Sequence, residues 1–179
     1  RRLAAHTVGF VGDDNHGLGG VELSFDRDLS PGEGRRMGDQ VFLTIDAGIQ
    51  YALETISRKT LIDNNAEAVM MMAMDSASGD ILAWVSLPDF DPNDIRNSTE
   101  QQRVNRASTW AYEPGSVFKI FSLSAIMELG GINEHSSWYC NGTYTRTAPN
   151  GESISLGCLS IHGQVKLPEI IAYSCNVGT

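Results

Sequence analysis

The stretch YEPGSVFKIF, residues 112–121, places a serine and a lysine three positions apart among apolar side chains. A serine hydroxyl becomes an effective nucleophile only when a nearby base takes its proton, and an amine does so only in its uncharged form. Residues three apart on a helix share a face, so Lys119 can reach Ser116. Burial would favour the uncharged amine. The neighbours expected to bury it are Val117, Phe118, Ile120 and Phe121.

A second group of candidate residues, Ser-x-Asn, lies near the end of the chain, after a short predicted helix. The hydroxyl of Ser174 can pass a proton to a leaving amine, and the amide of Asn176 can bind both a substrate carbonyl and Lys119. A helix beginning at Ser116 would supply a backbone N–H and positive potential for an oxyanion. The alternative to a catalytic pair is an N-cap serine followed by a surface lysine. The presence of the Ser-x-Asn motif in the same chain favours acyl transfer.

Four potential metal ligands lie in the last quarter of the sequence: Cys140, Cys158, His162 and Cys175. Three thiols and an imidazole suit a structural zinc ion, although the spacings are wider than in a zinc finger, so folding would have to assemble the site. A disulfide between Cys140 and Cys158 is the second interpretation, which an oxidising compartment would favour. Free core thiols are the third. A metal here would brace the Ser-x-Asn loop.

Local patterns predict the elements that carry these residues. Apolar side chains recur at helical spacing from Ser116 until two glycines at 130–131 end the pattern. A turn-rich region of short strands follows, and the helix KLPEIIAYS, residues 166–174, leads into the Ser-x-Asn motif. The predicted helices therefore deliver both motifs at their ends.

Upstream, a short strand at Val41–Ile45 is expected to lead into a helix of about four turns with Asp46 as its N-cap. Two apolar runs around the turn Ser-Ala-Ser-Gly predict a β-hairpin, which Pro88 ends. The first run is apolar on both faces, so we expect a central strand covered on both sides. Its methionines, at 70, 71, 72 and 74, are expected to fill the core.

Residues 1–40 are rich in glycine and charge and show no sustained helical period, which indicates an accessory segment of short strands and turns. The formal net charge of −9 argues against a nucleic-acid partner or an anionic membrane surface. No apolar run approaches the roughly 20 residues that span a bilayer. The chain begins with two arginines and no methionine, so we expect a further segment upstream in the complete protein.

Five stretches of the chain together resemble one known family. Four of them are, in chain order, LTIDAGIQ, SGDILAWVSLPDFDPN, VNRASTWAYEPGSVFKIFSLSAIMELGGI and HGQVKLPEIIAYSCNVG. These four resemble the transpeptidase domain of the class B penicillin-binding proteins. The opening AAHTVGFVGDDNHGLGGVELSFDRDL resembles the pedestal that precedes this domain. The resemblance implies an α+β fold of the penicillin-binding and serine β-lactamase-like kind, an antiparallel sheet with helices packed on it. Residues 1–40 would be a small β-rich pedestal segment and 41–179 the N-terminal part of the transpeptidase domain.

The resemblance also implies a reaction, the cross-linking of peptidoglycan by a D,D-transpeptidase. Ser116 would be acylated by stem peptides or β-lactams, Lys119 would be its base, and Ser174 and Asn176 would form the second motif. No cofactor is required for this catalysis. The implied partners are peptidoglycan stem peptides, β-lactams and membrane proteins of cell-wall synthesis, in cell division or cell-shape maintenance. The family implies an anchor in the bacterial inner membrane and a domain facing the periplasm.

One departure from the family is the third motif, Lys-Thr/Ser-Gly, which does not occur before the sequence ends at Thr179. We therefore expect a truncated domain that is inactive alone, with an apolar sheet edge free to self-associate. Two other functions share the first two motifs: a β-lactam sensor that binds without turnover, and a scaffold whose site is idle. The pedestal-like opening favours the transpeptidase over the sensor.

Overall fold

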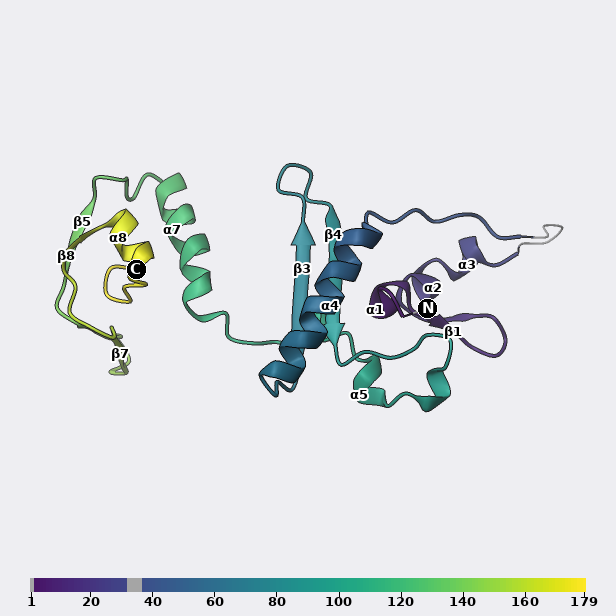
Figure 1. Ribbon diagram of the computed structural model, residues 1–179. Helices are drawn as coiled ribbons and strands as arrows, with labels where there is room; N and C mark the ends of the chain where they lie inside the picture. The colour runs from purple at the N-terminus through teal and green to yellow at the C-terminus, as the bar shows by residue number, and fades with distance from the viewer. Residues whose placement is uncertain (1, 32–36) are drawn as a thin grey trace. The chain divides into compact units, whose positions relative to one another are not determined.

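The computed structural model describes residues 2–31 and 37–179, and the chain divides into two compact units between Ala111 and Tyr112. Within the described residues, each unit combines helices with two-stranded antiparallel sheets (Figure 1). The predicted α+β class is therefore confirmed.

The first unit is built around one long helix and one long hairpin. Its helices are α1 (Ala5–Val8), α2 (Gly20–Ser24), α3 (Asp26–Leu29), α4 (Ala47–Asp63), α5 (Glu100–Arg103), α6 (Arg106–Thr109) and a 3-10 turn, η1 (Ile95–Asn97). Its strands are β1 (Phe10–Val11), β2 (Gly17–Gly19), β3 (Val69–Met74) and β4 (Ile81–Leu87). β1 pairs with β2, and β3 pairs with β4, both antiparallel.

Helix α4 begins where the sequence predicts, because the carboxylate of Asp46 accepts the backbone N–H of Ile49 at 2.8 Å. The helix packs on the β3–β4 hairpin through a small apolar core that includes Val85 and Leu87 (Figure 1). The fully buried Gln50 ties the helix to β4. Its amide accepts the N–H of Trp84 at 2.7 Å and donates to the carbonyl of the same residue at 2.9 Å. Both backbone groups of Trp84 are thereby satisfied.

Two expectations for this unit are wrong in detail. Residues 41–45 form no strand: Thr44 Oγ1 donates to the Ile81 carbonyl at 2.6 Å, without a ladder of bonds to β4. Strand β3 is also not covered on both faces, and Met70, Met72 and Met74 are 36, 53 and 59% exposed. Among the described residues α4 covers one face of the hairpin only, and strand alternation turns every second side chain away from it.

The N-terminal segment is less β-rich than expected, because α1, α2 and α3 occupy more of its described residues than β1 and β2 do. These helices have four or five residues, too few to create the periodic apolar stripe by which a helix is recognised in sequence. The segment is held by the buried Ala4 and Ala5 and by polar contacts. Asp26, for example, accepts the backbone N–H of Gly17 at 2.8 Å.

The second unit carries all the candidate residues named above. Its elements are the 3-10 turn η2 (Gly115–Phe118), α7 (Lys119–Glu128), β5 (Ser137–Cys140), β6 (Thr143–Thr147), β7 (Ser153–Gly157), β8 (Gly163–Lys166) and α8 (Leu167–Ala172). β5 pairs with β8 and β6 with β7, so the β6–β7 hairpin is an insertion between the partners of the first pair. Both predicted helices and the region of short strands are confirmed.

The core of the second unit joins α7 to α8 and to the β5–β8 pair. Its buried members are Leu123, Cys140, Val165, Leu167, Ile170 and Cys175. Two of the three cysteines are therefore core residues. Helix α8 and Cys175 are packed in this core. Ser174 and Asn176, on either side of Cys175, are therefore held close to Lys119 at the start of α7.

Candidate active site

The nucleophile candidate Ser116 lies in the 3-10 turn η2, and Lys119 opens helix α7. A 3-10 helix has three residues per turn, so side chains three apart lie one above the other. Gly115 enters the turn with a φ of 57°, a left-handed conformation that glycine adopts at little cost. Ser116 is exposed and Lys119 is half-buried. Ser116 therefore sits at the start of the helix, as expected.

The amine of Lys119 contacts both residues of the second motif. Nζ donates to the Ser174 carbonyl at 2.6 Å and to Asn176 Oδ1 at 2.6 Å, and it lies 3.2 Å from Ser174 Oγ. An uncharged amine has two hydrogens and one lone pair, so the two short bonds leave the lone pair available. An ammonium has three hydrogens, and Ser174 Oγ can accept the third. The arrangement accommodates both protonation states, as a base requires.

One expectation about Lys119 is wrong. Val117, Phe118, Ile120 and Phe121 were expected to bury Lys119, but each is more than half exposed. Helix α7 turns Leu123, which is 3% exposed, toward the core, so its other faces point away. Within the described part of the chain, the polar 174–176 loop rather than apolar packing surrounds the amine. No hydrogen bond joins Ser116 to Lys119 among the described residues, and such catalytic contacts often tighten only when the substrate is bound.

The turn after α8 aims Ser174 at the amine. Ser174 has a φ of 50°, in the left-handed region that non-glycine residues rarely adopt. Such a conformation commonly ends a helix, and here the N–H of Cys175 donates to the Ile170 carbonyl at 2.9 Å. A strained residue of this kind costs of order 1–3 kcal/mol and persists where the surroundings hold it. The buried Cys175 next to it supplies that hold.

Asn176 is held from the side opposite to Lys119. Its Nδ2 donates to the carbonyl of Gly157 at 2.6 Å, and its backbone N–H donates to the sulfur of Cys158 at 3.2 Å. The contribution of Gly157 could not be found from the sequence, because a backbone carbonyl has no residue-type signature. The adjacent Cys158 was a candidate, but only as a metal ligand or disulfide partner.

The structure brings together the four predicted metal-ligating residues. The ligand atoms of Cys140, Cys158, His162 and Cys175 all lie within 4.8 Å of one another. Cys158 Sγ is 3.7 Å from the sulfurs of both Cys140 and Cys175, and Cys140 Sγ is 3.5 Å from His162 Nδ1. At these distances the three cysteines are free thiols and form no disulfide. The cluster could hold a metal ion.

The thiols differ in their electrostatic surroundings. A hydrogen bond from the backbone N–H of His162 lowers the pKa of Cys140 to about 6, whereas burial raises the pKa of Cys175. The imidazole of His162 stacks on the ring of Tyr173, with centroids 5.3 Å apart. The N–H of Gly178 donates to Cys175 Sγ at 3.3 Å. Backbone donors around sulfur favour the thiolate, which is the form that binds metal.

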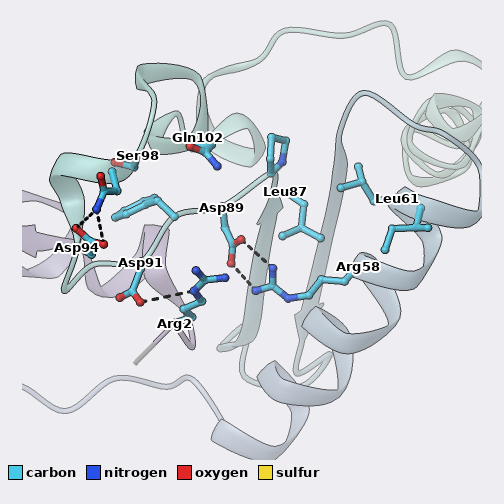
Figure 2. A pocket seen from close by; sticks show the side chains of 13 residues that line it. Arg2, Arg58, Leu61, Leu87, Asp89, Asp91, Asp94, Ser98 and Gln102 are labelled. Carbon is cyan, nitrogen blue, oxygen red and sulfur yellow. Dashed lines mark hydrogen bonds and ion pairs between the residues drawn. The ribbon is translucent and has the colours of Figure 1, made fainter.

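A separate cavity of about 360 Å³ lies in the first unit (Figure 2). Asp89 accepts a hydrogen bond from Arg58 Nη1 at 2.8 Å, and Asp91 pairs with Arg2 at 3.6 Å. The remaining described polar lining includes Asp94, Ser98 and Gln102, drawn in the same view. The charges at its centre are paired with one another, and none of the candidate catalytic residues lines it. We therefore assign no chemistry to this cavity.

Comparison with known proteins identifies the family to which the residues of this site belong. Residues 69–179 match the family model of the penicillin binding protein transpeptidase domain. The chain belongs to the penicillin-binding protein transpeptidase family. The matched segment includes both motifs and the whole thiol cluster. The family comprises peptidoglycan D,D-transpeptidases, the targets of β-lactams, and its FtsI members act in division.

The relatives resemble the chain over almost its whole length. It is 31% identical to a probable peptidoglycan D,D-transpeptidase FtsI of Caulobacter vibrioides, over 98% of this chain and 29% of the relative. It is 27% identical to the peptidoglycan D,D-transpeptidase FtsI of Escherichia coli strain K12, over 98% of this chain and 32% of the relative. The chain thus spans about a third of the length of these curated relatives.

Solved structures of the family share this fold. Penicillin binding protein 3 from Mycobacterium tuberculosis matches with a TM-score of 0.85 and 30% identity, over 98% of this chain and 40% of that one. The same protein complexed with aztreonam matches equally well. Across residues 2–31 and 37–179, no helix combines the length and apolar character needed to cross a membrane.

Proposed function

We propose that this chain carries the nucleophile and base of a peptidoglycan D,D-transpeptidase that works through a serine acyl-enzyme. The observation that carries the proposal is the set of contacts at Lys119, whose amine is held by Ser174 and Asn176 one 3-10 turn from Ser116. In this assignment Ser116 is the nucleophile and Lys119 its base. Ser174 relays a proton, and Asn176 positions the base and the substrate carbonyl.

The reaction proceeds in two acyl transfers. Ser116 Oγ attacks the carbonyl between the two D-alanines of a donor stem peptide while its proton passes to Lys119. The proton then goes to the amine of the departing D-alanine, through Ser174. In the second half an amine of another stem peptide attacks the ester, gives up a proton by the same route and releases Ser116. A β-lactam enters the first half and stops there as an acyl adduct.

The proposal is tested by the covalent adduct. The full-length protein that contains this chain should gain the mass of one β-lactam at Ser116, and Ser116→Ala should gain none. Ser122→Ala is the matched control, since Ser122 lies on α7 and its hydroxyl donates only to the Phe118 carbonyl, at 3.4 Å. A stoichiometric adduct on Ser116→Ala would show that the nucleophile is elsewhere.

A second assay separates the transpeptidase from a β-lactam sensor. A transpeptidase should transfer the acyl group from a donor peptide ending in D-Ala-D-Ala to an added amine and release free D-alanine. A sensor would form the adduct with the β-lactam and show no transfer. Release of D-alanine by the Ser122→Ala control but not by Ser116→Ala is the expected result.

The proposal extends to the remainder of the protein. Residues 41–179 would be the N-terminal part of the transpeptidase domain and 1–40 a pedestal segment. The full-length protein would be anchored in the bacterial inner membrane, with this chain in the periplasm and cell-wall synthesis proteins as partners. The relatives' resemblance over almost the whole chain supports these assignments.

We also propose that Cys140, Cys158, His162 and Cys175 hold a structural zinc ion. With Zn–S bonds of about 2.3 Å and Zn–N bonds of about 2.1 Å, a regular tetrahedron has S–S edges of about 3.8 Å and S–N edges of about 3.6 Å. Two S–S separations of 3.7 Å and one S–N separation of 3.5 Å fit these edges, and all the ligand atoms lie within 4.8 Å of one another. Backbone donors to two of the sulfurs fit a thiolate site as well.

Elemental analysis of protein purified without chelator tests the zinc proposal. We expect about one zinc per chain, with three thiols that react freely only after chelation. Less than a tenth of an equivalent, with thiols that titrate at once, would refute the metal. Loss of two thiols in the untreated protein would instead indicate a disulfide.

A further inference from the structure

We infer that Cys158 is a positioning residue for the acylation step, acting on Lys119 through Asn176. This inference rests on the proposed function, because it concerns the rate at which Ser116 is acylated. It assigns to Cys158 a role separate from that of a metal ligand. The role follows from three contacts that converge on Asn176.

Two hydrogen bonds join Asn176 to the segment Gly157–Cys158. The Gly157 carbonyl accepts the side-chain N–H of Asn176 at 2.6 Å, and the Cys158 sulfur accepts its backbone N–H at 3.2 Å. The segment is itself anchored, because the N–H of Cys158 donates to the Gly142 carbonyl at 2.9 Å. Both the backbone and the side chain of Asn176 are thus held by adjacent residues of one connection.

The Gly157 carbonyl decides which way the Asn176 amide points, and the Cys158 sulfur fixes the backbone that carries this amide. A carbonyl can only accept, so the atom facing Gly157 must be Nδ2, and Oδ1 must then face Lys119. The reverse orientation would set two carbonyl oxygens 2.6 Å apart at Gly157 and would take away one of the two short acceptors of the lysine amine. Holding Asn176 in the first orientation leaves the lysine lone pair free for the proton of Ser116.

The other thiols provide a comparison. Cys140 belongs to the same cluster and is fully buried, but its contacts are with Cys158 and His162, not with Asn176. Loss of either thiol removes one member of the cluster. Only loss of Cys158 also removes the acceptor of the Asn176 N–H.

The test compares Cys158→Ala with Cys140→Ala in the full-length protein. Acylation by a chromogenic cephalosporin is followed by stopped flow, which separates the initial dissociation constant from the acylation rate constant. We expect both variants to lose zinc, and Cys158→Ala to acylate at least about tenfold more slowly than Cys140→Ala with an unchanged dissociation constant, because misplacing a catalytic group by about 1 Å can cost about 10²-fold in rate. Cys158→Ser, whose hydroxyl can accept the N–H, should recover part of the rate. Leu159→Ala, at an exposed neighbour, should behave as the unsubstituted protein.

A second measurement avoids any failure of a variant to fold. Cys158 is more accessible than the buried Cys140 and Cys175, so methyl methanethiolsulfonate should modify it first in the chelated protein. The thiol forms a mixed disulfide with the methylthio group and methanesulfinic acid leaves. The modified protein should acylate about tenfold more slowly, and dithiothreitol should restore the rate.

The outcomes separate the two proposals. Equal acylation rates in Cys158→Ala and Cys140→Ala, while the unsubstituted protein forms its Ser116 adduct, overturn the inference alone. So does an unchanged rate after modification of Cys158. A missing Ser116 adduct in the unsubstituted protein overturns the proposed function and this inference with it.

Discussion

Replacement of Lys119 by alanine tests the chemistry and the architecture of the site together. The substitution removes the proposed proton acceptor of Ser116 and also the hydrogen bonds between α7 and the 174–176 loop. Ser116 and the shape of the pocket remain. The acylation rate constant should therefore fall much more than the initial binding of a β-lactam weakens.

The size of both effects follows from the contacts. A general base contributes about 10²- to 10⁴-fold in rate, which corresponds to roughly 3–5 kcal/mol in the activation free energy. The two 2.6 Å hydrogen bonds of Nζ are partly exposed, so each should contribute about 0.5–1.5 kcal/mol to the free energy of unfolding. We therefore expect a loss of about 1–3 kcal/mol in stability from the two bonds together.

Stopped-flow acylation with a chromogenic cephalosporin measures the first effect, and urea unfolding measures the second. Lys59→Ala is the matched control, because Lys59 is an exposed lysine of α4 that pairs with Asp63 one turn away. Lys59→Ala should lower the free energy of unfolding by less than about 0.5 kcal/mol and leave the acylation rate constant unchanged. An acylation rate constant within tenfold of the unsubstituted protein for Lys119→Ala would refute its role as base.

Three further predictions concern the rest of the chain. Gln50→Leu should lower the free energy of unfolding by about 2–4 kcal/mol in urea, because the half-buried N–H and carbonyl of Trp84 lose their partners. An unchanged value would show that water replaces the amide. Burial lowers the pKa of His6, so its imidazole binds a proton on unfolding, and stability should fall as the pH drops below about 6.5. His6→Gln should lose less stability between about pH 7.5 and 5.5, and an identical pH profile would contradict this. The isolated chain should self-associate through apolar side chains such as Phe121, which is 65% exposed. Light scattering measures this, and a persistent monomer would contradict the prediction.

Signals within a few residues were enough to predict several elements. The N-cap at Asp46 and the glycines after α7 mark the ends of two helices, and the structure has both. The hairpin of β3 and β4 follows from two apolar runs around a polar turn. In each case local interactions decide the element. They are the capping hydrogen bonds, the turn conformation or the alternation of apolar and polar side chains. The first 40 residues were harder, because one-turn helices have no repeating pattern.

By itself the sequence determined which residue types are present to do chemistry: a serine and a lysine one turn apart, a Ser-x-Asn pair, three thiols and a histidine. The sequence also suggested that the Asn176 amide can bind Lys119, but only the tertiary structure showed that the amine contacts both Ser174 and Asn176, which lie 55 and 57 residues away. The tertiary structure also decided that β3 and α7 expose apolar side chains expected to be buried, and that a carbonyl at Gly157 orients Asn176. Such contacts depend on how the core of Leu123, Ile170 and Cys175 joins segments that are distant in the sequence. A backbone carbonyl cannot be recognised as a specific acceptor from the sequence either, because every residue has one.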